Sequence, residues 1–404
     1  MLRKLCFSAL LVLCSSNVLA ATVNLSASAG NGSVSLSWSV SNGSINAQEV
    51  YRDTDSNPSG RVRIASVSTG TRSYTATGLT NGTTYYFWVK ARQSSDNVWV
   101  NSNVASATPA GSTSTPSGFW QLSGNLGTHD PTIVQENGIW YEFQTGPGIY
   151  RKISRNGGTY WEPLPSVLPN KLSWWSNYVP NQNGTDVWAP DARTYNGRAY
   201  LFYSVSTFGS RVSFIGLLSS SSFAADSWRD DGLVIATNNS SNYNAIDPDL
   251  TVDASGNPWL SFGSWNSGIK LTRLNSSMKP TGTLYSIASR SGGIEAPNII
   301  YRNGYYYLFV STGLCCQGVN STYQIRYGRS TSITGTYVDK NGTSMMSGGG
   351  SLLDGGNSVW VGPGGQDIAG TNVIARHAYD ATDNGNAKLL INTLNWDSSG
   401  WPTY

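Results

Sequence analysis

The clearest pattern in the first part of the chain is an alternation of apolar and polar residues. It is plain in residues 34–40 (VSLSWSV) and again in residues 85–92 (YYFWVKAR), where every second residue is apolar. A period of two is that of a strand with one buried face. Such strands recur between Gly-, Ser- and Asn-rich turns over residues 21–108, which predicts an antiparallel β-sandwich.

A longer repeat runs through residues 119–404. In each copy an acidic residue is followed six to nine positions later by a Gly turn, and then by a strand rich in aromatic residues. The copies begin at Asp130, Asp191, Asp247 and Glu295. Units of about 50 to 60 residues with several strands and no evident helix have the size of a propeller blade. We therefore expect an all-β fold in which a five-bladed β-propeller follows the sandwich.

The same repeat predicts where the acids lie. A solenoid is the alternative architecture, but solenoid repeats are usually shorter and more regular. In a propeller the first strand of each blade lies nearest the axis, so a residue at the end of that strand faces the mouth of the axial channel. We expect the four acids to converge at this mouth.

The chain begins with the features of a secretory signal peptide. Arg3 and Lys4 precede an apolar run that gives way to small and polar residues before Ala20, and we expect cleavage after Ala20. A membrane anchor would need about 20 unbroken apolar residues, and residues 15–17 interrupt this run. We expect a signal peptide (1–20), the sandwich (21–108), a Ser/Thr/Pro-rich linker (109–118) and the propeller (119–404), in a secreted chain that is extracellular or periplasmic and free of the membrane.

Composition narrows the class of partner. A formal net charge of +3, with the basic residues scattered, excludes a nucleic-acid groove. Fifteen Trp and 22 Tyr fit either β-sheet cores or surfaces that stack on sugar rings, so a neutral polymer is the expected partner and the chain is expected to be a monomer. After loss of the signal peptide only the neighbours Cys315 and Cys316 remain, as two thiols or as a ring, and two Cys alone cannot form a zinc site.

Clustered carboxyl groups point to one kind of chemistry. Carboxylates that lie close together at low dielectric repel one another, which raises at least one pKa. Hydrolysis of a glycosidic bond uses such an arrangement, because one carboxylic acid protonates the leaving oxygen while a carboxylate activates water or attacks. The chain has two histidines, His129 and His377, and neither stands in a Ser-His-Asp pattern or in paired metal-ligand spacing.

Four ordered motifs around these acids resemble those of glycoside hydrolase family 43. They are His129-Asp130-Pro131, Trp188-Ala189-Pro190-Asp191, Asn244-Ala245-Ile246-Asp247-Pro248 and Ile294-Glu295-Ala296-Pro297. Residues 309–312, 315–316, 321–323 and 333–335 look like the endo-arabinanase branch of that family. In the first domain, residues 79–85 and Trp38 are similar to the tyrosine corner and strand tryptophan of fibronectin type III modules.

The resemblance implies an inverting hydrolase that cleaves α-1,5-L-arabinan of plant cell-wall polysaccharide. It implies that Asp130 is the general base, that Glu295 is the general acid, and that Asp247 orients Glu295 and raises its pKa. Asp249, two residues further along, is the structural alternative to Asp247, and Asp191 is expected to make a structural hydrogen bond. Asp before Pro is also a common turn residue.

Substrate contacts are expected from three further residues: Trp188, Asn244 and Ser264. Trp188 could equally be a core residue. Two other functions stay open, namely an exo-acting α-L-arabinofuranosidase or β-xylosidase of the same family, and a propeller that binds glycan without cleaving it.

The resemblance also bears on a metal ion. Similar endo-arabinanases carry a His in the last blade that helps to hold a calcium ion in the axial channel, and here that position is Gly365. Gln366 or Asp367 could supply oxygen ligands instead, whereas His377 is expected either in the core or behind the residues that contact the substrate. Proton transfer between carboxyl groups and water needs no metal, so we expect no cofactor to be required, and a calcium ion would be structural.

Overall fold

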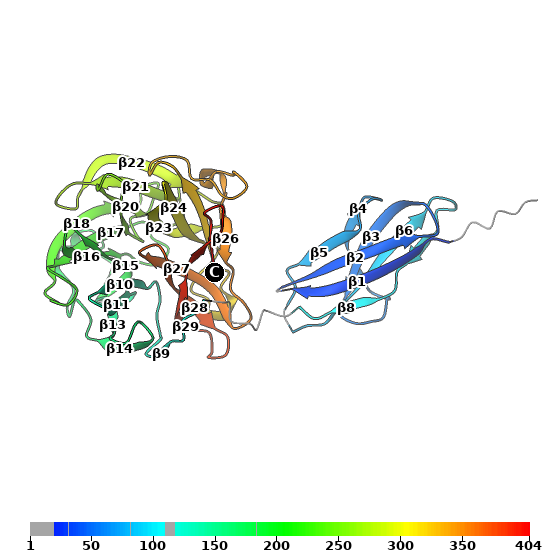
Figure 1. Ribbon diagram of the computed structural model, residues 1–404, viewed down its shortest axis with the longest axis horizontal. Helices are drawn as coiled ribbons and strands as arrows, with labels where there is room; N and C mark the ends of the chain where they lie inside the picture. Colours follow the sequence, from blue (N-terminus) through cyan, green and yellow to red (C-terminus); the bar gives the residue numbers. More distant parts are fainter. Residues whose placement is uncertain (1–19, 31, 81, 110–117, 183) are drawn as a thin grey trace, which may run out of the picture. The chain divides into compact units, whose positions relative to one another are not determined.

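Figure 1 shows the computed structural model, which describes residues 20–30, 32–80, 82–109, 118–182 and 184–404. The chain divides into two compact units, Met1–Ser112 and Thr113–Tyr404. The expected signal peptide, except for Ala20, and the expected linker, except for Pro109 and Gly118, lie outside the described residues. Within the described part, no helix is long and apolar enough to span a bilayer.

The first unit is the expected sandwich of two antiparallel sheets. One sheet has the order β1 (Thr22–Gly30), β2 (Ser33–Ser41), β5 (Ser73–Thr77). The other has the order β4 (Val62–Val67), β3 (Ile45–Asp53), β6 (Tyr85–Gln93), β7 (Trp99–Asn101), and β8 (Ala105–Ala107) also pairs with β6. The alternating apolar residues of both sheets meet in one core.

Two contacts give this unit the details expected from its sequence. The Tyr85 hydroxyl accepts a hydrogen bond from the Thr80 backbone N–H at 3.1 Å, as in a tyrosine corner. Trp38 is buried, and its ring N–H donates to Gln48 Oε1 at 2.8 Å, because a buried indole N–H needs an acceptor.

The second unit is a propeller of five antiparallel sheets, seen around a common axis in Figure 1. Blade 1 is β10 (Thr132–Glu136), β11 (Ile139–Gln144), β13 (Tyr150–Ser154), β14 (Tyr160–Leu164), with β9 (Ser123–Gly124) at its edge. Blade 2 is β15 (Asp186–Tyr195), β16 (Arg198–Val205), β17 (Ser213–Ser220), β18 (Arg229–Thr237), with β12 (Gly146–Pro147) beside β15. Blade 3 is β19 (Asp249–Val252), β20 (Pro258–Phe262), β21 (Ile269–Leu274), β22 (Pro280–Ala288).

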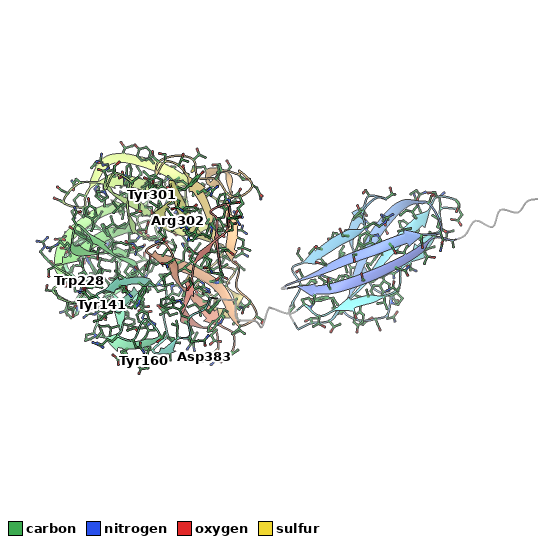
Figure 2. All side chains as sticks on the ribbon, viewed as in Figure 1. Tyr141, Tyr160, Trp228, Tyr301, Arg302 and Asp383 are labelled. Carbon is green, nitrogen blue, oxygen red and sulfur yellow. A yellow bond between two sulfur atoms is a disulfide. The ribbon has the colours of Figure 1, made fainter. Side chains whose placement is uncertain are left out.

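The last two blades complete the ring. Blade 4 is β23 (Ile294–Arg302), β24 (Tyr305–Thr312), β25 (Gln324–Ser330), β26 (Ser351–Asp354), and blade 5 is β27 (Trp360–Ala369), β28 (Val373–Asp380), β29 (Asn386–Thr393). Short 3₁₀ turns lie at Ser173–Asn177, Gly318–Asn320 and Met345–Ser347, and β30 (Asn395–Trp396) pairs with β31 (Pro402–Thr403). Arg302, labelled in Figure 2, ends β23 and lies 4.4 Å from the Trp396 ring, which ties blade 4 to this C-terminal hairpin.

The two ends of the propeller meet on its last strand. The Trp120 N–H donates to Ile391 O, and the Leu389 N–H donates to Leu126 O. Residues 118–120 and 126–128 thus run beside β29 at the edge of blade 5, while β9 between them pairs with β14 of blade 1. In the centre, β10 contacts β15 and β27, while β19 contacts β15 and β23, and β23 contacts β27, so the five innermost strands form a closed ring.

A buried polar cluster joins all five innermost strands. Arg193 of β15 forms ion pairs with Asp191 at 3.1 Å, with Asp249 of β19 at 3.2 Å, and with Asp367 of β27. Asn298 of β23 donates to Asp249 and Asp367, and Thr132 of β10 donates to Asp367. We call these six residues the hub.

The charges of the hub are unevenly matched. Burial lowers the pKa of Arg193, but the attraction of Asp191, Asp367 and Asp249 outweighs it and holds that pKa above its usual value. Burial raises the pKa of Asp191 well above its usual value despite the neighbouring guanidinium. One cation facing three buried carboxyl groups favours a protonated carboxyl among them.

Replacing the central cation of the hub, Arg193→Met, should destabilise the propeller. Three buried carboxyl groups would lose their counter-ion, and removing one partner of a buried ion pair typically costs about 3 to 5 kcal/mol. Denaturant unfolding should show a loss of that size in the free energy of unfolding. Arg155→Met is the matched control, because the Arg155–Glu162 pair is half-exposed and such pairs contribute at most about 1 kcal/mol. Equal losses in the two variants would contradict the hub's role.

Candidate active site

Five structurally equivalent triplets line the upper part of the axial channel. Each lies in or directly before an innermost strand, and together they are Asp130-Pro131-Thr132, Ala189-Pro190-Asp191, Asp247-Pro248-Asp249, Ala296-Pro297-Asn298 and Gly365-Gln366-Asp367. The first residue of every triplet has a positive φ, between 40° and 58°. The left-handed residue interrupts the regular alternation of its strand, and the pairing register shifts at three of the triplets. First and third residues alike line the channel, and we call them the first and the second layer because the third residues contact one another in the hub.

This register corrects the expectation that four equivalent acids meet at the mouth. Asp130 and Asp247 occupy the first layer, where blades 2, 4 and 5 place Ala189, Ala296 and Gly365. Asp191 lies in the second layer with Asp249, inside the hub. Glu295 stands one residue before its triplet. The acids looked equivalent because each precedes a Gly turn by a similar distance, although that distance varies by up to three residues.

Asp191 and Asp249 have the structural hydrogen bonds expected of them. Asp191 accepts from the Leu250 N–H at 2.8 Å. Asp249 accepts from Asn298 on one oxygen, and from the Ser261 hydroxyl and the Ile299 N–H on the other. Their oxygens are therefore used within the propeller.

Asp130 is held as a carboxylate. Its Oδ2 lies 2.8 Å from His129 Nδ1 and accepts a hydrogen bond from the Thr145 hydroxyl at 2.7 Å. Burial raises the pKa of Asp130, but the charge and hydrogen bond of His129, together with His377 and Thr145, outweigh it and hold the pKa well below its usual value. Asp130 is therefore ionised across the neutral range and can accept a proton.

The pKa of Glu295 is shifted in the opposite direction to that of Asp130. Burial raises its pKa, and the charge of Asp130 adds to that rise. Two donors work against the rise, namely the Ser264 hydroxyl on Oε2 at 2.6 Å and the Tyr323 hydroxyl on Oε1 at 2.5 Å. The net effect is a raised pKa, so Glu295 can keep a proton at a higher pH than an exposed glutamic acid.

Asp247 lies beside Glu295. Its Oδ2 accepts from the N–H of Ala296, the residue that follows Glu295, at 3.0 Å, and its own N–H donates to Ser204. Burial raises the pKa of Asp247 well above its usual value, and the charges of Glu295 and Asp130 raise it further. Repulsion between two carboxyl groups is mutual, so their protons belong to the pair.

The three expected substrate contacts differ in position. Ser264 is bound to Glu295. Trp188 is half-buried on β15, next to Ala189 of the first layer. Asn244 is buried, and its amide accepts from the Ser213 hydroxyl and donates to Ser210 O, so its polar atoms already have protein partners.

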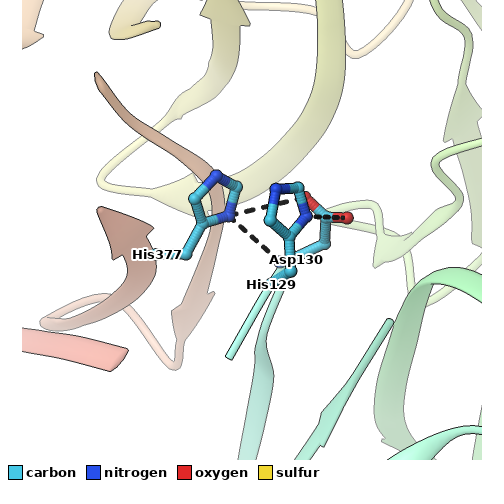
Figure 3. A group of neighbouring side chains, drawn as sticks. All are labelled: His129, Asp130 and His377. Carbon is cyan, nitrogen blue, oxygen red and sulfur yellow. Dashed lines mark hydrogen bonds and ion pairs between the residues drawn. The ribbon is translucent and has the colours of Figure 1, made fainter. Parts of the chain in front are cut away.

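The sequence did not reveal the residues that control the protonation of Asp130 and Glu295. Thr145 carries no motif, and Tyr323 entered only through the resemblance of residues 321–323. His129 was set aside for lack of a triad or metal-ligand spacing, although its place directly before Asp130 was a signal. His377 is fully buried, as expected, and its ring stacks on that of His129 at 3.9 Å (Figure 3).

Comparison with known proteins follows the same division of the chain. The profile described as glycosyl hydrolases family 43 matches residues 128–402, and that of the fibronectin type III domain matches residues 20–103. An extracellular endo-α-(1→5)-L-arabinanase of Bacillus subtilis is 56% identical over 294 residues, which is 71% of this chain and 90% of that protein. The chain belongs to glycoside hydrolase family 43.

Solved structures of family 43 enzymes agree with the propeller. An endo-arabinanase from Bacillus licheniformis is 57% identical with a TM-score of 0.69, covering 71% of this chain and all of that chain. An α-L-arabinanase of Cellvibrio cellulosa, solved in complex with arabinohexaose, is 38% identical with a TM-score of 0.66, covering 69% of this chain and 95% of that chain. The chain is thus a family 43 propeller preceded by a fibronectin type III domain.

The side chains around Asp130 and Gly365 decide whether the calcium ion suggested by the resemblance would fit. His129, Asp130 and His377 offer ligand atoms within 4.8 Å of one another and could hold a metal ion. Calcium prefers six to eight oxygen ligands, and of these three residues Asp130 alone offers oxygens. The oxygens of Gln366 and Asp367 are engaged, by Ser311 and by the hub. The side chains present therefore fit calcium poorly.

The space at Gly365 is filled by its neighbours. A Cβ at this position would lie 2.5 Å from Asp130 Oδ1 and 3.0 Å from His377 Nδ1. The imidazole of His377, which comes from the adjacent strand β28, thus occupies the region that a side chain at position 365 would enter.

Gly365→Ala provides the second prediction. The added methyl group would displace the Asp130 carboxylate, so activity should fall at least tenfold, and the free energy of unfolding should fall by about 1 to 3 kcal/mol. Gly342→Ala is the matched control, since Gly342 also has a positive φ but has no atom within 4 Å of the added Cβ. Kinetics and denaturant unfolding measure the two effects, and equal activity of the two variants would contradict the contact with Asp130.

Proposed function

We propose that this protein is a secreted endo-acting arabinanase that hydrolyses α-1,5-L-arabinan with inversion. The observation that carries the proposal is the opposite shift of two buried carboxyl groups in one channel mouth: the pKa of Asp130 is lowered and that of Glu295 is raised. Titratable groups with pKa values pushed apart are suited to act as a base and an acid in the same step. The identity of 56% to an endo-arabinanase supports arabinan as the substrate.

In the proposed mechanism Asp130 removes a proton from a water molecule, which attacks the anomeric carbon. Glu295 protonates the departing oxygen of the next arabinose unit. Asp247 orients Glu295 through the Ala296 N–H, and the mutual repulsion of the two carboxyl groups keeps a proton on the pair. Trp188, Asn244 and Ser264 remain our proposed contacts to substrate, with Ser264 acting through Glu295 as well.

Several further statements belong to the same proposal. Signal peptide cleavage after Ala20 would give an extracellular or periplasmic monomer, and extracellular relatives support export. The boundaries are those expected from the sequence: residues 21–108 for the fibronectin type III domain, 109–118 for the linker and 119–404 for the catalytic domain. Arabinan or a related plant polysaccharide is the partner.

Exo action is the second candidate. An exo-α-(1→5)-L-arabinofuranosidase of Cellvibrio japonicus is 40% identical over 297 residues, covering 68% of this chain and 85% of that protein. The higher identity to the Bacillus endo-arabinanase favours endo action. A propeller that only binds glycan would gain nothing from clustered carboxyl groups, which destabilise the fold.

A time course on debranched arabinan tests the function. Endo action should release a ladder of oligosaccharides from the start, whereas exo action would release one short product while the polymer stays long. Proton NMR of the first products should show the β anomer, since inversion of an α linkage produces β. An Asp130→Asn variant that still binds oligosaccharide should be inactive. Initial release of the α anomer would contradict Asp130 as the base.

Ser264→Ala should move the pH profile in a defined direction. The Ser264 hydroxyl donates to Glu295 Oε2 and lowers the pKa of that carboxyl. Removing the donor should raise the pKa of Glu295, so the acid stays protonated to a higher pH and the basic limb of kcat/KM moves upward. Ser267→Ala, in the same loop, is the control, because among the described residues Ser267 Oγ has no hydrogen-bond partner. A shift of the basic limb to lower pH would contradict Glu295 as the acid.

A further inference from the structure

An unbroken series of contacts leads from the neighbouring cysteines to Asp130. Cys315 and Cys316 form a disulfide. The Cys316 backbone N–H donates to the Tyr379 hydroxyl at 2.8 Å, and that hydroxyl lies 2.9 Å from His129 Nε2. His129 Nδ1 in turn lies 2.8 Å from Asp130 Oδ2.

Along this series each group can donate a hydrogen bond to the next, from the Cys316 N–H to the Asp130 carboxylate. The Tyr379 oxygen accepts from the backbone N–H, so its own proton can be donated to His129 Nε2. His129 then carries its proton on Nδ1 and donates it to the Asp130 carboxylate. If His129 takes up a second proton, Nδ1–H remains on Asp130, so the contact with the carboxylate is kept in both states.

His377 fixes the other side of Asp130. The Asp130 backbone N–H donates to His377 Nδ1 at 3.1 Å (Figure 3). This contact needs a lone pair on His377 Nδ1 and so assigns the proton of the neutral ring to Nε2, the opposite tautomer to that of neutral His129. The resulting buried Nε2–H has no hydrogen-bond partner among the described residues. The stacked rings thus hold both the backbone and the side chain of Asp130.

The consequence is a difference between the two oxygens of Asp130. Oδ2 is occupied by His129 and Thr145. Oδ1 lies beside Gly365 and 3.5 Å from His377 Nδ1, and among the described residues no hydrogen-bond donor meets it. Oδ1 is therefore the oxygen left to accept a proton from water.

The first link of the series depends on the disulfide. Cys316 is exposed, has a left-handed φ of 67°, and its Sγ lies 3.9 Å from His129 Nε2. The ring formed by two bonded neighbours fixes the peptide group between them, including the N–H that meets Tyr379. Reduction to two thiols would release that peptide group and allow the left-handed residue to relax.

We propose that the Cys315–Cys316 disulfide, Tyr379 and His129 are positioning elements that hold Asp130 with Oδ1 directed to the attacking water. The inference rests on the proposed function, in which Asp130 is the base. It makes the enzyme sensitive to thiol reductants. A dithiol such as dithiothreitol would break the S–S bond, its two electrons and two protons would pass to the cysteines as thiols, and the dithiol would become a cyclic disulfide.

The experiment measures kcat and KM of the full chain on debranched arabinan before and after treatment with dithiothreitol. Because mispositioning the base affects the reacting geometry more than the bound ground state, kcat should fall about tenfold with little change in KM. Reoxidation should restore kcat. The mature chain has no other cysteine, so a Cys315→Ser/Cys316→Ser variant should show the low kcat and no response to the reductant. An unchanged kcat after complete reduction would overturn the role of the disulfide.

Tyr379→Phe tests whether the disulfide acts through the series. This variant should have the low kcat already, and reduction should lower it no further, whereas independent effects would multiply. His129→Asn should retain more activity than His129→Ala, because the Asn side-chain amide can still donate to Asp130 Oδ2. Near-wild-type kcat of Tyr379→Phe, or equal loss in the two His129 variants, would overturn the proposal.

A measurement without substrate separates this proposal from the proposed function. The chain has only two histidines, so their ring ¹⁵N signals are readily assigned. His129 should be protonated on Nδ1 and His377 on Nε2, and reduction should change the signals of His129. Absence of arabinan hydrolysis by the untreated enzyme, with these signals as expected, would overturn the proposed function and still support the series. Signals of the opposite tautomers would overturn the series even if arabinan is cleaved.

Discussion

The propeller depends on one partly buried arginine. Arg193 and the three carboxyl groups around it bring together five strands that have no backbone hydrogen bonds to one another across the axis. The blades themselves are held by apolar packing between sheets, and such packing tolerates small sliding movements. Charge-assisted hydrogen bonds with fixed geometry do not. The hub therefore fixes the position of each innermost strand along the channel axis. In doing so it also fixes the position of the first residue of each triplet.

The site is a consequence of that register. The third residues of the triplets build the hub, and the first residues build the layer in which Asp130 and Asp247 meet Glu295. In one layer the carboxyl groups have Arg193 and hydrogen-bond donors of other strands as partners. The other layer keeps the ionised Asp130 near Asp247 and Glu295, whose pKa values are raised. Stability and chemistry are thus assigned to alternate residues of the same strands, which keeps the acids close together without requiring them to stabilise the fold.

Much of the fold and part of the site could be predicted from the sequence. The features that could not be predicted depend on contacts between residues far apart in the chain. The period of two along residues 34–40 and 85–92, and the repeat of Gly turns, were sufficient for the sandwich and the propeller, because both are local signals. Asp191 was placed at the mouth with the other acids because a repeat of variable spacing does not define register to one residue. Arg193, Thr145 and Tyr323 were missed because their roles arise from contacts between blades. The imidazole of His377, on the neighbouring strand β28, fills the region that a side chain at position 365 would occupy. A sequence motif does not show this, because the two positions belong to different strands.

The closure of the ring has a consequence for how the protein is made. Residues 118–120 and 126–128 complete blade 5 by pairing with β29, and Trp120 meets Thr393 across 273 residues of sequence. During synthesis the first segment of the propeller must wait, unpaired, until almost the whole domain has emerged. Contacts of such long range form slowly, so closure of the ring comes late in the folding of this domain. The same pairing that protects the finished ring from fraying thus delays its completion until the last blade has been made.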